Sequence, residues 1–278
     1  MSNKVAIIVA PNGARKQKTD HKSIPISIQE IVDDVKECRK AGAIMAHVHA
    51  RNSEGQHSLE IDDNLKLLEA LESKLGDSII IQLTTEAIER YTPSQQMQLI
   101  REVKPPAASF ALRELLPSPT VSSQTIDFFH WVAEQNILAQ YILYNQEDVE
   151  RYSKLCRSNM LPKKGRHALF VLGSYRNNSI NYPKDLLPFL YDEFITTEHW
   201  GACAFGENEF NCLSAVMLLG GDIRVGFENN HCTSSGNLAL SNATQVEYIV
   251  KRACKSGVSL YGANEYKRCL MRIEGESS

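Results

Sequence analysis

Residues 27–49 read SIQEIVDDVKECRKAGAIMAHVH and contain the structural unit from which the fold is built. Apolar residues recur at helical spacing over residues 28–41, which predicts an amphipathic helix. Ser27 is expected as its N-cap, with Glu30 completing a capping box, and Gly42 follows where a left-handed residue ends a helix. The apolar run at residues 43–49 then predicts a buried strand.

The same alternation of apolar runs and helical spacing extends along the chain. Buried strands are predicted at residues 4–10, 43–49, 78–83, 107–111, 137–144, 167–172, 199–204 and 222–227. Helices are predicted at residues 28–41, 61–75, 93–103, 121–134, 146–157, 183–191, 207–219 and 242–256. This order predicts an α/β protein with parallel strands that close into a (β/α)8 TIM barrel, a single domain over residues 1–278. A doubly wound sheet is the alternative, but the glycine-rich dinucleotide motif and the P-loop are both missing.

Composition and charge exclude several classes of protein. The chain has 278 residues, of which 43% are hydrophobic and 23% charged, so it is long and apolar enough for a globular core. With 30 Lys and Arg against 33 Asp and Glu, it lacks the single-sign field that attracts nucleic acid or an anionic membrane. The apolar run within residues 1–10 is too short for a signal peptide or a membrane span. The 7 cysteines are scattered, without a Cys-x-x-Cys pair, which favours a cytoplasmic protein.

Two predicted strand ends carry residues that can bind a metal. His47 and His49 are two residues apart at the end of the second strand, so both side chains point to the same face. The last strand contains Arg224 and is followed by Glu228 and Asn229, and barrel closure would leave only the first strand between these two ends. Two nitrogens and one oxygen from His47, His49 and Glu228 match a catalytic zinc site, and nickel, cobalt or manganese would accept the same ligands. The alternative is that one histidine is a hydrogen-bonded core residue and the other faces a helix.

Several stretches, in the same order over nearly the whole chain, resemble the β-keto acid cleavage enzymes. They are the first-strand turn, GAIMAHVHAR (42–51), SIIIQLTTEA (78–87), FVLG (170–173), LLGGDIRVGFENN (218–230) and ALSNATQVE (239–247). The combination of His-x-His-x-Arg with Gly-Gly-x-x-Arg-x-Gly-x-Glu is specific. The resemblance implies a (β/α)8 barrel that assembles as a homotetramer, with zinc held by His47, His49 and Glu228. It also implies that a β-keto acid and acetyl-CoA become acetoacetate and a new acyl-CoA, without a redox cofactor.

The acid-base residues depart from the family pattern. Family members typically have Asp after the zinc-binding Glu, where this chain has Asn229, and a neutral amide cannot act as general base. Asn229 is then expected to orient the substrate or Arg224. Glu86 adds a carboxylate at the end of the third strand, and we hypothesise that it replaces the missing base, with Arg224 holding the carboxylate of the substrate or of Glu86. The alternative is that Glu86 is a solvent-exposed loop residue or a partner for Arg113.

The predicted substrate contacts come from other strand ends. Thr84 and Ser109 match hydroxyl positions of the family, although such hydroxyls can also satisfy nearby backbone groups. The full set expected to contact substrate is Thr84, Ser109, Asn12, Gly13 and Arg15. Members that act on amino-bearing keto acids have an acid in the first turn and acids on the fifth strand, where this chain has Arg15 and then Gln-Tyr-Ile at residues 140–142. We therefore predict a substrate without an amine, either neutral at its far end or with a second carboxylate for Arg15.

These observations favour a zinc-dependent β-keto acid cleavage enzyme that uses acetyl-CoA. Arg15, Arg113 and Arg176 are candidates for the CoA phosphates, but no spacing rule assigns them. Two other functions remain open: a metal-dependent lyase or hydrolase without CoA, and a metal-bound barrel that binds an anionic metabolite without turnover. Nucleic acid and membranes are not expected as partners.

Overall fold

The computed structural model describes residues 4–174 and 180–272. Its parallel strands close into one barrel in the order β2 (Ile7–Val9), β3 (Met45–Val48), β4 (Ile80–Thr84), β5 (Ala107–Ala111), β6 (Leu138–Leu143), β7 (Arg166–Leu172), β8 (Trp200–Ala204) and β9 (Asp222–Val225). The last strand pairs with the first, which places Arg224 opposite Ile8. This closure confirms the (β/α)8 TIM barrel and excludes the doubly wound sheet.

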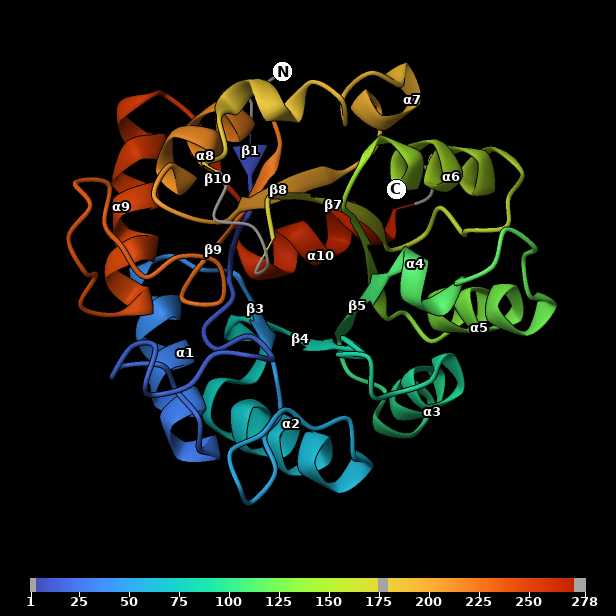
Figure 1. Ribbon diagram of the computed structural model, residues 1–278, viewed down its shortest axis with the longest axis horizontal. Helices are drawn as coiled ribbons and strands as arrows, with labels where there is room; N and C mark the ends of the chain where they lie inside the picture. Colours follow the sequence, from blue (N-terminus) through green and yellow to red (C-terminus); the bar gives the residue numbers. More distant parts are fainter. Residues whose placement is uncertain (1–3, 175–179, 273–278) are drawn as a thin grey trace.

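Helices cover the outside of the barrel and one of its ends (Figure 1). They are α1 (Ile28–Ala41), α2 (Ile61–Leu75), η1 (Gly76–Ser78), α3 (Pro93–Val103), α4 (Leu112–Leu115), α5 (Ser123–Glu134), α6 (Gln146–Arg157), η2 (Pro183–Leu186), α7 (Glu193–Thr196), α8 (Glu209–Leu218), α9 (Asn242–Lys255) and α10 (Ala263–Met271). The predicted capping of α1 is confirmed: Ser27 and Glu30 form a capping box, and Gly42 ends the helix with φ 117°. Among the described residues, none of the helices has the length and apolarity to cross a membrane.

Two predicted elements differ from the structure. The strand expected at residues 4–10 is divided: β1 (Lys4–Val5) pairs with β10 (Ser259–Leu260) outside the barrel, and only β2 joins it. The helix expected at residues 183–191 was wrong, because this segment forms only η2, and α7 follows it. Pro188 explains the difference, since proline lacks the backbone N–H that a longer helix would need at this position.

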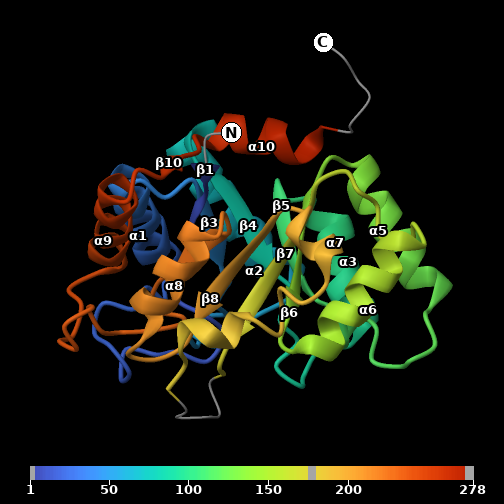
Figure 2. The same ribbon diagram turned by 90° about the horizontal axis from the view of Figure 1, so that it is seen from above.

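Helix α10, which the sequence did not predict, closes one end of the barrel. It lies across that end beside β1 and β10 (Figure 2). Its Tyr266 and Leu270 pack against apolar side chains from the starts of the barrel strands, including Ile8. The Tyr266 hydroxyl donates to Asp222 (2.5 Å), which also contacts His167 Nε2 (3.1 Å). The amino-terminal end of the barrel is therefore filled, and the carboxyl-terminal end is left for a site.

Candidate active site

Three potential metal ligands converge at the carboxyl-terminal end of the barrel. His47 lies in β3, His49 directly follows this strand, and Glu228 follows β9. The two Nε2 atoms are 3.1 Å apart, and Glu228 Oε2 lies 3.2 Å from His49 Nε2 and 3.5 Å from His47 Nε2. Ligands at about 2.1 Å from a tetrahedral zinc ion are about 3.4 Å from one another. The donor atoms of the three side chains thus fit a divalent metal without rearrangement.

The protonation states of the three side chains are also those that metal binding requires. The Nδ1–H of His47 donates to Gln82 Oε1 (2.8 Å), which leaves the Nε2 lone pair directed at the cluster. Burial lowers the pKa of His47 to about 4 and that of His49 to about 3, so both rings are neutral at pH 7. Burial alone would raise the pKa of Glu228, but Arg224 and the two histidines outweigh it and hold this pKa well below its usual value. Two neutral imidazoles and one carboxylate are the donor set of catalytic zinc sites.

The turn after β2 positions His49. The Asn12 side chain donates to the carbonyl of His49 (3.0 Å) and accepts from its N–H (3.2 Å). Arg51, the arginine of the His-x-His-x-Arg motif, donates to the carbonyls of Asn12 and Gly13. Of the three residues predicted here as substrate contacts, Arg15 lines the cavity described below, whereas Asn12 and Gly13 are not among the lining residues.

Close backbone packing and two polar side chains position Glu228. Gly226 has φ 142°, and a Cβ at this position would lie 2.4 Å from the carbonyl oxygen of Ala10. The N–H of Phe227 donates to Asn242 Oδ1 (2.7 Å), and Arg224 donates to Glu228 Oε1 (3.0 Å). Glycine is required at residue 226 because β2 and β9 approach each other there.

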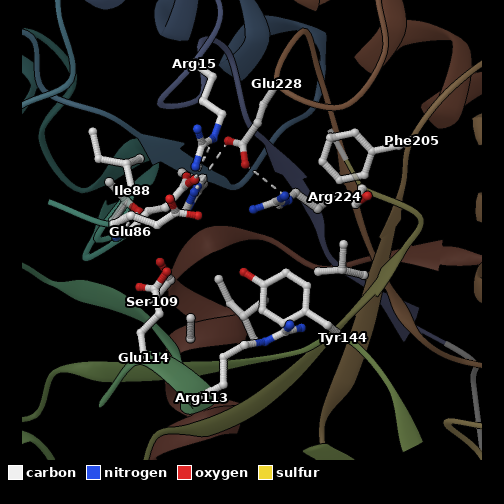
Figure 3. A pocket seen from close by; sticks show the side chains of 17 residues that line it. Arg15, Glu86, Ile88, Ser109, Arg113, Glu114, Tyr144, Phe205, Arg224 and Glu228 are labelled. Atoms are coloured by element: carbon white, nitrogen blue, oxygen red, sulfur yellow. Dashed lines mark hydrogen bonds and ion pairs between the residues drawn. The ribbon is translucent and has the colours of Figure 1, made fainter. Parts of the chain in front are cut away.

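A cavity of about 630 Å³ opens beside the cluster (Figure 3). Its walls include most of the predicted site residues, namely Arg15, His47, Thr84, Glu86, Ser109, Arg224 and Glu228. Asn229 is buried, neither atom of its amide has a hydrogen-bond partner, and it does not line this cavity. Arg176 lies outside the described residues.

Glu86 follows the end of β4 next to the cluster, and hydrogen bonds fix the backbone at this point. Its N–H donates to Thr84 Oγ1 (3.0 Å), its carbonyl contacts His57 Nε2 (2.9 Å), and Glu114 accepts from the next N–H, that of Ala87 (3.0 Å). Its carboxylate lies 4.0 Å from His49 Nδ1 and 4.0 Å from Arg15 Nε. Burial, and then the charge of Glu228, raise the pKa of Glu86 to about 8.

From the sequence, the alternative role for Glu86 is to pair with Arg113. In the structure, the partner of Arg113 is Asp148. Arg113 pairs with Asp148 (3.3 Å) and lies over the Tyr144 ring, 3.6 Å from its centre. Sequence reasoning missed four side chains of the site: Gln82, His57, Glu114 and Tyr144. It also missed the structural role of Arg51. Gln82 had a usable signal, because it is a polar residue in an apolar strand, two positions before Thr84 and therefore on the same face.

A closed parallel barrel with a cavity at its carboxyl-terminal end has the architecture of a barrel enzyme, and the two-histidine, one-carboxylate cluster beside that cavity is a candidate metal site. More particularly, the chain belongs to the beta-keto acid cleavage enzyme family, whose sequence profile matches residues 4–271.

Relatives agree with this assignment, and a solved structure shares the fold. The chain is 25% identical to 3-keto-5-aminohexanoate cleavage enzyme of Fusobacterium nucleatum, over 97% of this chain and 98% of that protein. It is 24% identical to 3-oxoadipate:acetyl-CoA acetyltransferase of Cupriavidus necator, over 90% of this chain and 88% of that protein. The apo structure of ObcA shares the fold with a TM-score of 0.70 at 14% identity, over 89% of this chain and 65% of that chain. The present chain thus spans about two thirds of ObcA.

Proposed function

We propose that this protein is a zinc-dependent β-keto acid cleavage enzyme that exchanges acyl groups with acetyl-CoA. The products would be acetoacetate and a new acyl-CoA. One observation carries the proposal: the donor atoms of His47, His49 and Glu228 lie within 3.5 Å of one another beside the carboxylate of Glu86, at a cavity of substrate size. Family membership and the Cupriavidus relative, named for an acetyl-CoA reaction, support the same activity.

Zinc would be held by His47, His49 and Glu228. When bound, it would supply a Lewis acid that polarises the keto oxygen of the substrate and stabilises developing negative charge there. Another divalent transition metal with the same ligand preference would supply similar chemistry.

Neighbouring side chains would bind the carboxylate of the keto acid. Ser109 Oγ is buried without a hydrogen-bond partner at the cavity wall, so a substrate oxygen would satisfy it. Thr84 Oγ1 accepts from Glu86 N–H and keeps its own hydrogen to donate. The Arg224 guanidinium lies at the same wall, next to Glu228, and would provide the positive charge.

In its ionised form, Glu86 would remove the proton from the carbon between the keto group and the carboxylate. With a pKa of about 8, this form is the minor one at pH 7 and increases as pH rises. That carbon then bonds to the acetyl carbon of acetyl-CoA, and the CoA thiolate leaves. The thiolate next takes the original acyl group as the bond between this group and the central carbon breaks. The electron pair of that bond stays on the central carbon, which takes back the proton held by Glu86. Atoms and charge balance, with acetoacetate and acyl-CoA as products. Asn229 would act indirectly, since it does not line the cavity.

Assays of zinc-loaded protein with a panel of β-keto acids and acetyl-CoA test this proposal, with mass spectrometry of new acyl-CoA. We expect product that is lost in His49→Ala and retained in His130→Ala, whose histidine lies on α5 away from the cluster. Cleavage without acetyl-CoA would instead identify a CoA-independent lyase or hydrolase. Binding of keto acids without any product would identify a metabolite-binding barrel.

We also propose a cytoplasmic homotetramer as the working form. The cysteines in the described residues are all free, as expected in a reducing compartment, and the tetramer follows from the family resemblance. Light scattering of the purified protein, with and without reductant, tests both the subunit number and its independence of disulfides.

A further inference from the structure

The inside of the barrel is divided into a polar half and an apolar half. The candidate metal ligands and Glu86 come from the ends of β3, β4 and β9. On β6, β7 and β8, in contrast, the inward side chains form a separate apolar cluster that includes Ile142 and Val171, with Tyr144 and Phe205 packed against it. These four side chains line the cavity, and Figure 3 shows Glu86 and the Tyr144 ring on opposite sides of it.

The strand order places the two halves across the barrel from each other. The metal cluster lies on both sides of β2, because its ligands come from β3 and β9. In a closed barrel of eight strands, β6 is four strands away from β2 in either direction and therefore opposite to it. A keto acid whose reacting atoms lie at the cluster brings its tail to β6 and its neighbours when its chain extends across the cavity.

Residues 140–142 show why this wall lacks charge. Gln140 is inside the barrel but below the cavity wall, where it contacts His167 (3.1 Å). Tyr141 points outward into the core between strands and helices. Ile142 alone of the three lines the cavity.

The arginines that line the cavity already have carboxylate neighbours. Arg224 pairs with Glu228 at 3.0 Å, Arg113 with Asp148 at 3.3 Å, and Arg15 lies 4.0 Å from Glu86. A second carboxylate on the substrate would have to compete with Glu228 for Arg224 and with Asp148 for Arg113. On the β6–β8 wall, Ile142, Val171 and Phe205 would offer it only carbon atoms. An ammonium group would likewise meet no carboxylate on that wall.

We propose that the enzyme selects β-keto acids with an uncharged alkyl tail, which packs on Ile142, Val171 and Phe205. This inference rests on the proposed function and narrows it to one substrate class. Alkyl carbon gains from leaving water for an apolar wall, whereas a terminal charge placed there loses its hydration without a partner. The tail group would therefore decide specificity, even though the reacting end of all β-keto acids is the same.

Three six-carbon acids provide a matched test: 3-oxohexanoate, 3-oxoadipate and 3-keto-5-aminohexanoate. They share the reacting end and the chain length, and differ in an uncharged, a carboxylate or an ammonium-bearing tail. We expect kcat/KM for 3-oxohexanoate to exceed that for each charged acid by at least about a hundredfold. Preference for 3-oxoadipate would overturn the proposal and indicate that Arg15 binds the second carboxylate. Preference for 3-keto-5-aminohexanoate would also overturn it.

Two variants test whether the apolar wall of the cavity determines the substrate preference. Val171→Ala shortens a side chain on the cavity wall and should lower kcat/KM for 3-oxohexanoate about tenfold while shifting preference toward 3-oxooctanoate. Leu172→Val, the control, removes one carbon from the next residue, which faces the helices. It should leave the chain-length preference unchanged. Equal shifts in both variants would refute the role of the wall.

Binding separates this inference from the proposed reaction. Calorimetry of the three acids with zinc-loaded protein needs no turnover, and we expect the same order of affinity. Absence of acyl-CoA from all three acids would refute the exchange reaction, yet tight binding of the alkyl acid alone would still support the apolar tail site. Equal affinities would refute the tail site, whatever the turnover.

Discussion

Replacing Gln82 by Met should weaken zinc binding without removing a ligand. The amide oxygen of Gln82 accepts the Nδ1–H of His47 at 2.8 Å, and this bond holds the ring with its Nε2 lone pair toward the cluster. Both residues are 1% exposed, so water cannot easily replace the lost acceptor. Loss of such a partner costs about 10- to 100-fold in metal affinity, which corresponds to about 1.4–2.8 kcal/mol. Methionine keeps nearly the same volume, so the change is mainly the lost acceptor.

Gln140→Met is the matched control for this experiment. Gln140 is also buried inside the barrel and also contacts a histidine, but that histidine is His167 (3.1 Å), which belongs to the closed end of the barrel. Titration against a zinc-binding chromophore gives Kd for both variants, and thermal unfolding reports the general cost of losing a buried hydrogen bond. We expect similar losses of Tm but a weaker Kd only in Gln82→Met. A Kd within twofold of the wild type in Gln82→Met, or an equal loss in Gln140→Met, would refute this reasoning.

Three further predictions concern the base, pH and backbone packing. Glu86→Gln should lower kcat about 10²- to 10⁴-fold with unchanged zinc content, measured by acyl-CoA formation and metal analysis; full turnover would remove Glu86 as the base. Burial raises the pKa of Asp34 from 3.8 to about 7, so the folded state keeps a proton that the unfolded chain releases, and the free energy of unfolding falls as pH rises through this range. Asp34→Asn can keep the hydrogen bond from Asn242 and should make this decline shallower in denaturant titrations, with the part due to Glu86 remaining; an identical pH profile would contradict the shift. Gly226→Ala should destabilise the protein by about 3 kcal/mol and impair zinc binding, because its Cβ would lie 2.4 Å from the Ala10 carbonyl; wild-type Tm would show that β2 and β9 can separate.

The repeating fold and the candidate metal ligands could be predicted from the sequence because both depend on local patterns. Helical spacing, the capping box at Ser27 and the left-handed Gly42 reflect interactions within a few residues of chain, and α1 begins and ends where they indicate. The spacing of His47 and His49 follows from the two-residue period of a strand. Glu228 could be joined to them only because the strand count predicted closure, and closure is what brings β9 next to β2.

The tertiary structure decided which residues meet across the barrel. Helix α10 follows the last barrel unit, and only its packing on Ile8 and its bond to Asp222 show that it closes the amino-terminal end. The placement of Gln82 against His47, and of Ile142 opposite the cluster, depends on strand register and barrel closure rather than on local pattern. Apolar periodicity records that a side chain is buried, and it is the same whether that side chain faces a helix or a substrate cavity. The sequence therefore determined the barrel and the candidate metal ligands, and three-dimensional closure determined which buried side chains form the walls of the site.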